Sequence, residues 1–101
     1  MRFFCIGDHD TVTGFRFAGV EGVAVESPGE ARRELYRALG QRDIGVIIIP
    51  DQISAQLQSE INEVRFTRTE PAIVEIAGPE GRRKDRRHLV DLIREAIGVR
   101  V

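Results

Sequence analysis

The segment Ile44 to Pro50, with the sequence IGVIIIP, constrains the fold more than any other part of the chain. Its β-branched residues favour a strand, and they are consecutive rather than alternating with polar residues. A strand of this kind is buried on both faces, as the central strands of parallel sheets are. We therefore expect this segment at the centre of a parallel sheet that has helices on both faces.

Three further short apolar segments predict the remaining strands: Phe3 to Ile6, Val23 to Val25, and Ala72 to Ile76. Each strand is followed by turn residues and then by a helical pattern. This alternation predicts an α/β fold with a four-stranded parallel sheet of order 2-1-3-4, similar to receiver domains and flavodoxins. The side chains that we expect in its core are Phe3, Cys5, Val46 and Ile48.

Four segments carry helical patterns. The first helix is expected to be capped by Thr11 or Asp10, and the second by Ser27, which precedes Pro28 and Glu30 in a capping-box arrangement. The third helix begins at about Gln52 or Ser54 and places four apolar residues on one side, before a polar connection from Arg65 to Glu70. These four residues are Ile53, Leu57, Ile61 and Val64.

The chain of 101 residues is long enough for a single core. We expect residues 1–77 to form a compact α/β domain. Residues 78–101 are expected to form a flexible basic loop and a C-terminal amphipathic helix over about Asp85 to Ile97. The apolar side of that helix comprises Leu89, Leu92, Ile93, Ala96 and Ile97.

Composition excludes several classes of function. The formal net charge of -1 provides no general attraction to nucleic acid, and the basic run Arg82 to Arg87 has no interleaved aromatic residues. With one cysteine, Cys5, and two histidines, a structural zinc site would lack ligands. No apolar segment approaches the roughly 20 residues of a membrane-spanning helix, so we expect a cytoplasmic protein without direct membrane insertion.

Acidic residues follow two strands that the predicted order makes neighbours. Asp8 and Asp10 come after the first strand, and Asp51 comes after the third. Their carboxylates could converge at the carboxyl edge of the sheet, as the Mg²⁺-binding acids of a receiver domain do. A receiver also needs a hydroxyl residue after strand four and a lysine after a fifth strand, which this chain lacks. We therefore expect no catalytic magnesium site and no cofactor, although a receiver-like module that binds Mg²⁺ and phosphate remains the alternative function.

The segment Gly7 to Val20, GDHDTVTGFRFAGV, resembles the N-terminal signature of the F subunit of the V-type and A-type rotary ATPases. In that family a Gly-Asp-x-Asp-Thr-Val-x-Gly-Phe sequence precedes an aliphatic-Ala-Gly step. Ile44 to Ile49, Pro71 to Ile76 and Ala96-Ile97-Gly98 also match the family pattern. The chain departs from it at Pro50-Asp51 and in its arginine-rich loop.

The resemblance implies a non-catalytic component of the central stalk. Such a component binds the coiled-coil axle, which is the D subunit, inside the head formed by the A and B subunits, where the nucleotide sites lie. It would couple ATP hydrolysis or synthesis to proton or sodium translocation, and it would be associated with the membrane only through the complex. The family also implies a C-terminal helix that can change position.

Binding to an axle requires an apolar patch rimmed with charge. Phe15 and Phe17 lie two residues apart, so one helix cannot bury both side chains on the same face. Either one ring faces outward, or both pack internally around a bent helix end. The candidates in the first helix are Thr13, Gly14, Phe15, Arg16 and Phe17. The candidates in the C-terminal helix are Arg86, Leu89, Ile93, Arg94 and Ile97.

Overall fold

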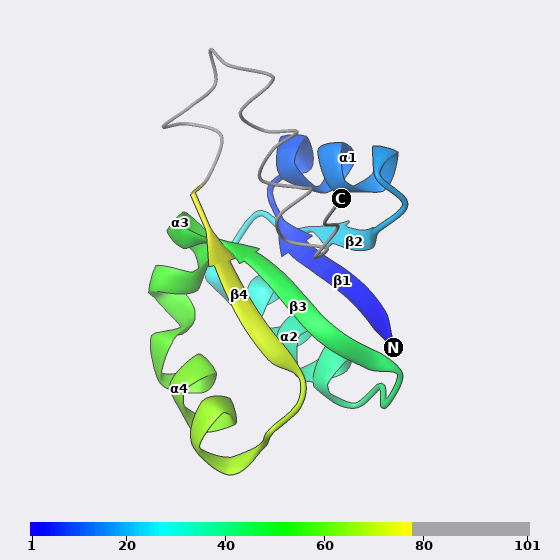
Figure 1. The fold of residues 1–101 in the computed structure, drawn as a ribbon. Helices are drawn as coiled ribbons and strands as arrows, with labels where there is room; N and C mark the ends of the chain where they lie inside the picture. The colour runs from blue at the N-terminus through cyan, green and yellow to red at the C-terminus, as the bar shows by residue number, and fades with distance from the viewer. Residues whose placement is uncertain (78–101) are drawn as a thin grey trace.

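The computed structural model describes residues 1–77, which form alternating strands and helices (Figure 1). The strands are β1 (Arg2–Gly7), β2 (Glu21–Ala24), β3 (Ile44–Pro50) and β4 (Ala72–Ile76). The helices are α1 (His9–Phe17), α2 (Pro28–Leu39), α3 (Asp51–Ser54) and α4 (Gln58–Thr67), with a 3₁₀ turn, η1 (Ala55–Leu57), between the last two.

All four strands are parallel, and their order in the sheet is β2-β1-β3-β4. This confirms the predicted fold class and strand order. In the interior of the sheet, Cys5 of β1 lies beside Ile48 of β3, which in turn lies beside Val74 of β4. Ile47, Ile48 and Ile49 are all fully buried, as expected for a strand that is covered on both faces.

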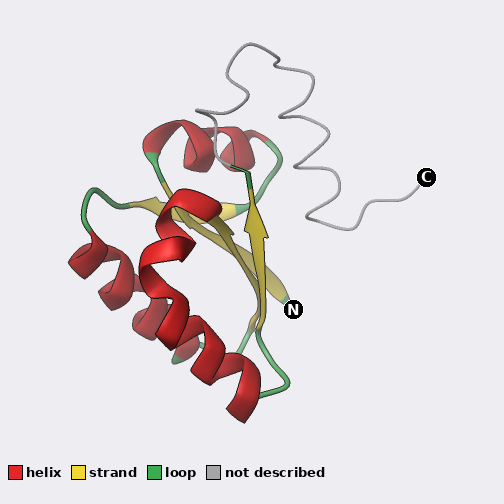
Figure 2. Cartoon of the chain, turned by 90° about the vertical axis from the view of Figure 1, so that its left-hand side faces the viewer, coloured by secondary structure: helices red, strands yellow, loops and turns green. Residues whose placement is uncertain are grey.

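One face of the sheet is covered by α2, η1 and α4, which Figure 2 shows packed together. Leu35 of α2 and Ile61 of α4 are buried against this face. An ion pair between Arg32 Nε and Glu60 Oε2, at 2.8 Å, joins the two long helices near the surface. The hydrogen bond from Arg32 is the main cause that lowers the pKa of Glu60.

The other face is covered over the described residues by α1, through Val12 and Phe15. Cys5 and Ile48 are completely buried beneath it, as predicted. Phe3 and Val46, which we also expected in the core, are only half-buried. The nine-residue α1 follows directly from the carboxyl end of β1.

The start of α2 follows the predicted capping box. Ser27 Oγ accepts a hydrogen bond from the Glu30 backbone N–H at 3.1 Å, and Pro28 occupies the first helical position. The Glu30 carboxylate reaches back to accept from the backbone N–H of Glu26 at 2.7 Å. This combination defines where the chain leaves β2 and enters the helix.

The prediction of one continuous helix after β3 was wrong, because the structure has two helices there with a 3₁₀ turn between them. The segment begins at Asp51 and is divided by η1, because Leu57 has a non-helical backbone with φ -122° and ψ 22°. Leu57 is nevertheless fully buried, so the break turns this side chain into the core. Helix α4 also continues to Thr67, beyond the predicted start of the polar connection at Arg65.

No helix within residues 1–77 is long and apolar enough to cross a membrane.

Candidate functional site

Helix α1 is held at the carboxyl end of β1 by the side chain of Asp8. Asp8 is the N-cap, and its Oδ2 accepts a hydrogen bond from the Thr11 backbone N–H at 3.1 Å. The prediction that Thr11 or Asp10 caps this helix was therefore wrong. A Cβ atom on Gly7 would lie only 3.0 Å from Pro50 Cγ, so the end of β1 packs closely against the end of β3. Helix α1 begins at His9, directly after the Asp8 cap.

The three acidic residues at the carboxyl edge of the sheet all lie at helix starts. Asp8 caps α1, Asp10 is in its first turn, and Asp51 is the first residue of α3. Among residues 1–77, no three His, Cys, Asp or Glu side chains gather in a group that could hold a metal ion. Carboxylates at helix N-termini interact favourably with the helix dipole, which accounts for their positions without a metal.

Phe15 and Phe17 point to opposite environments. Phe15 is 0% exposed and is part of the core between α1 and the sheet. Phe17 is 88% exposed at the end of the same helix. A phenyl ring in water costs free energy that burial against a partner would recover.

Thr13, Arg16 and Phe17 lie three and four residues apart and therefore share one side of α1. All three are exposed, and Gly14 beside them is half-buried. No ion pair of Arg16 is found among the described residues. We call Thr13, Gly14, Arg16 and Phe17 the α1 surface. Phe15 does not contribute to it, because its side chain is enclosed.

The five candidates from the C-terminal segment lie outside the described residues. They are Arg86, Leu89, Ile93, Arg94 and Ile97.

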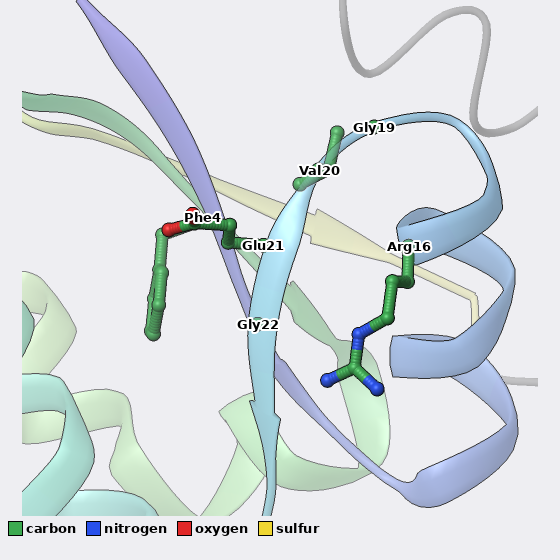
Figure 3. A pocket seen from close by; sticks show the side chains of 6 residues that line it. All are labelled: Phe4, Arg16, Gly19, Val20, Glu21 and Gly22. Carbon is green, nitrogen blue, oxygen red and sulfur yellow. The ribbon is translucent and has the colours of Figure 1, made fainter.

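A shallow groove of about 480 Å³ adjoins the α1 surface at the edge strand β2 (Figure 3). Arg16 extends into it from α1, while Phe4 lies on the other side of β2. The remaining lining residues are Gly19, Val20, Glu21 and Gly22. Gly19 has a φ of 87°, a left-handed conformation that favours glycine, and this turn brings the chain from α1 into β2.

Arg2 holds the beginning of β2 in place through Glu21. Its guanidinium donates to Glu21 Oε1 at 2.6 Å, to Asp43 Oδ2 at 2.8 Å and to Gln41 Oε1 at 2.6 Å. One side chain thereby joins β1, β2 and the connection between α2 and β3. The hydrogen bond from Arg2 is the largest cause that lowers the pKa of Asp43. Sequence reasoning missed this cluster, because its members are up to 41 residues apart.

Cys5, the single cysteine, lies on β1 beneath α1. Burial is the main cause that raises its pKa to about 12, and the nearby charge of Asp8 adds to the effect. A thiol with this pKa is almost entirely protonated at neutral pH, so it is a poor nucleophile. Its role in the described structure is to fill the core.

The family model described as the ATP synthase (F/14-kDa) subunit matches residues 4–96 of the chain. The F subunit of the A-type ATP synthase of Methanothermobacter thermautotrophicus is 43% identical over 98 residues, which cover 93% of this chain and 90% of that protein. The corresponding F subunit of Pyrococcus furiosus is 36% identical over 104 residues, covering 98% of this chain and 96% of that protein.

A crystal structure of the V-type ATP synthase F subunit from Archaeoglobus fulgidus has a similar fold. Its TM-score is 0.63 at 27% sequence identity, and the match covers 75% of this chain and 96% of that one. The match with the family model extends over most of the chain and includes the Gly-Asp-x-Asp-Thr-Val segment around the Asp8 cap. The chain belongs to the family of the F (14-kDa) subunits of the A-type and V-type ATP synthases.

Proposed function

We propose that this protein is a non-catalytic part of the central stalk and binds the coiled-coil axle, the D subunit, through the α1 surface. The observation that carries the proposal is the 88% exposure of Phe17 beside Arg16. An exposed aromatic ring next to a cation is the arrangement found at the centres of protein interfaces, where aromatic and arginine side chains dominate the binding energy.

The packing of α1 supports the same interpretation. Phe15 and Val12 are buried on the inner side of the helix, and the Asp8 cap holds its first turn. The outer residues Arg16 and Phe17 are thus presented from a fixed backbone. A preorganised surface of this kind loses little conformational freedom when a partner binds.

Within the complete enzyme, the protein would rotate with the axle and make transient contacts with the A and B subunits. In this way it would take part in coupling ATP hydrolysis or synthesis to the translocation of protons or sodium ions. Its association with the membrane would occur through the complex. The nucleotide chemistry belongs in this proposal to the other subunits, and this chain supplies no catalytic residue.

The alternative, a receiver-like module that binds Mg²⁺ and phosphate, has less support. Both carboxylate oxygens of Asp8 accept hydrogen bonds from Thr11, at 3.1 Å and 2.7 Å. Asp51 is exposed and begins α3. No observation in the described part of the chain favours phosphoryl transfer over docking.

The proposal is tested by mixing the purified chain with the purified axle protein of the same enzyme and separating the mixture by size-exclusion chromatography. We expect the two proteins to co-elute as a 1:1 complex. Incubation of the chain with Mg²⁺ and a small phosphoryl donor should leave its intact mass unchanged. Separate elution of the two proteins would contradict the proposal, and an aspartyl-phosphate adduct would favour the receiver-like alternative.

A further inference from the structure

The two faces of the sheet are covered to different extents by the described helices. On one face, α2, η1 and α4 bury Ile47 of β3 and Ile73 of β4. On the other face, the one helix among residues 1–77 is α1, and it packs mainly against β1 and β2. In the described part of the chain, no helix is centred over β3 and β4 on the α1 side.

Apolar side chains continue across this part of the face. Phe3 of β1 pairs with Val46 of β3, and Val46 pairs with Ala72 of β4, so these three residues form a row across adjacent strands. Phe3 and Val46 are half-buried, and Ala72 is exposed. Val74, which lies on the same side of β4 as Ala72, is also half-buried. We call Phe3, Val46, Ala72 and Val74 the apolar row, and a further element is needed to bury it completely.

The position at which β4 ends favours the rest of this chain as that element. The chain leaves the sheet after Ile76, which pairs with Pro50 of β3. Residues 78–101, which lie outside the described part, follow; they include the segment Asp85 to Ile97, with apolar residues at helical spacing. A helix of that length measures about 20 Å, close to the length of the strands. It is therefore long enough to run back along β3 and β4, as a helix does after a strand of a parallel sheet.

The charges at the carboxyl edge of the sheet favour the same course. Asp51 directly follows Pro50 and so lies beside the end of β4, and Asp10 lies in the first turn of α1 at the same edge. Both are exposed, and neither has an ion pair within residues 1–77. The first cations in the sequence after β4 are those of the run Arg82 to Arg87. A chain that turns back over the α1 side brings this run close to the two carboxylates.

We propose that residues 82–97 cover the apolar row in the free chain, with the run Arg82 to Arg87 against Asp10 and Asp51. The residues that pack on the row are those of the apolar side of the segment, Leu89, Leu92, Ile93, Ala96 and Ile97. In this arrangement they complete the core of this chain in place of binding the axle protein. The inference goes beyond the proposed function, because it concerns the chain alone and the row includes no residue of the α1 surface.

Methyl NMR on the full chain tests the packing directly. We expect nuclear Overhauser effects between the methyl groups of Ile93 and those of Val46 and Val74. Effects that join Ile93 to α2 or α4, or no effects between the segment and the sheet, would overturn the inference. So would effects that grow with protein concentration, which would identify a second copy, or effects that appear only with the axle protein as the contacting partner.

A substitution on the apolar side of the segment provides a second measurement. Ile93→Asp should release the segment, because packing would bury a carboxylate. The relaxation that a soluble paramagnetic agent induces at the Val46 and Val74 methyl groups should then rise at least about twofold. Glu95→Asp, which places the same side chain outside the apolar side, is the matched control and should cause no rise. Equal relaxation in the two variants would contradict the inference, and the Overhauser effects in the wild type decide the question even if Ile93→Asp does not fold.

The position of the basic run is tested by limited digestion with trypsin, which cleaves after arginine and lysine. Asp10→Asn combined with Asp51→Asn removes both carboxylates, so cleavage within Arg82 to Arg87 should become at least about threefold faster. Glu63→Gln is the control, because it removes an exposed carboxylate of α4 on the other face of the sheet. Equal cleavage rates in the wild type and the double variant would overturn the proposed position of the run.

Discussion

The Oδ1 atom of Asp8 accepts a hydrogen bond from the Oγ1 hydroxyl of Thr11 at 2.7 Å. Together with the bond from the Thr11 backbone N–H, this contact joins the end of β1 to the first turn of α1. An acidic residue that could have been a metal ligand therefore positions the helix that carries Phe17.

We predict that Asp8→Ala destabilises the fold by about 1 kcal/mol, because it removes the N-cap of α1. Asp8→Asn retains an acceptor oxygen and should lose less. Urea unfolding of the two variants and the wild type measures the difference. An alanine variant as stable as the wild type would mean that the cap does not hold the helix.

Ile48→Ala should lower the free energy of unfolding by roughly 2–5 kcal/mol, because it opens a cavity in a fully buried position. Val46→Ala, two residues earlier on the same face of β3, should cost less, because Val46 is only half-buried. Chemical denaturation compares them. A loss below about 1 kcal/mol for Ile48→Ala would contradict the central position of β3.

Asp43 should contribute to stability in a pH-dependent way. Its pKa is lower in the folded chain than in the unfolded one, so its contribution is present above the ordinary pKa of aspartate. It is lost as the pH falls through the lowered value. Asp43→Asn should therefore be less stable than the wild type at about pH 7, and the difference should shrink towards about pH 2. Urea midpoints that differ equally at both pH values would contradict this explanation.

Cys5 should resist thiol reagents in the native state, because it is buried and its pKa is raised to about 12. Labelling at mildly alkaline pH should follow the fraction of unfolded chain as urea is added. Rapid labelling without urea would show that the face of the sheet under α1 is open to solvent.

Periodicity and strand alternation were sufficient to predict the strand order and the burial of Ile47 to Ile49, because these depend on local pattern and on general rules of connection. Helical periodicity showed that one face cannot bury both Phe15 and Phe17 but left open whether both rings pack internally; in the structure Phe15 is buried and Phe17 is exposed. The break at Leu57 could not be predicted, because the apolar positions continue at helical spacing through it. The break comes from the tertiary packing of Leu57 and not from a local sequence signal. The contacts of Arg2 depend on residues distant in sequence, so no local pattern indicates them.

At the candidate site, the sequence suggested the α1 residues, which stay a prediction, but it gave no indication of the groove at β2. The groove forms where the Gly19 turn brings β2 beside Arg16, and this relation depends on the packing of α1 on the sheet. The N-cap was misassigned because three polar residues, Asp8, Asp10 and Thr11, lie close together in sequence and each is a suitable cap.

Phe66 provides a matched control for the role of Phe17. Both rings are 88% exposed and both lie near the end of a helix, but Phe66 belongs to α4, on the other face of the sheet. Replacing either ring by serine should change stability by no more than about 0.5 kcal/mol, because neither is part of the core.

The dissociation constant of the complex with the axle protein, measured by calorimetry for Phe17→Ser, Phe66→Ser and the wild type, tests the account most directly. We predict that Phe17→Ser weakens binding at least about tenfold, because it removes an aromatic ring buried on association. Phe66→Ser should bind as the wild type does. Unchanged binding by a folded Phe17→Ser variant, or an equal loss for both variants, would contradict docking through the α1 surface.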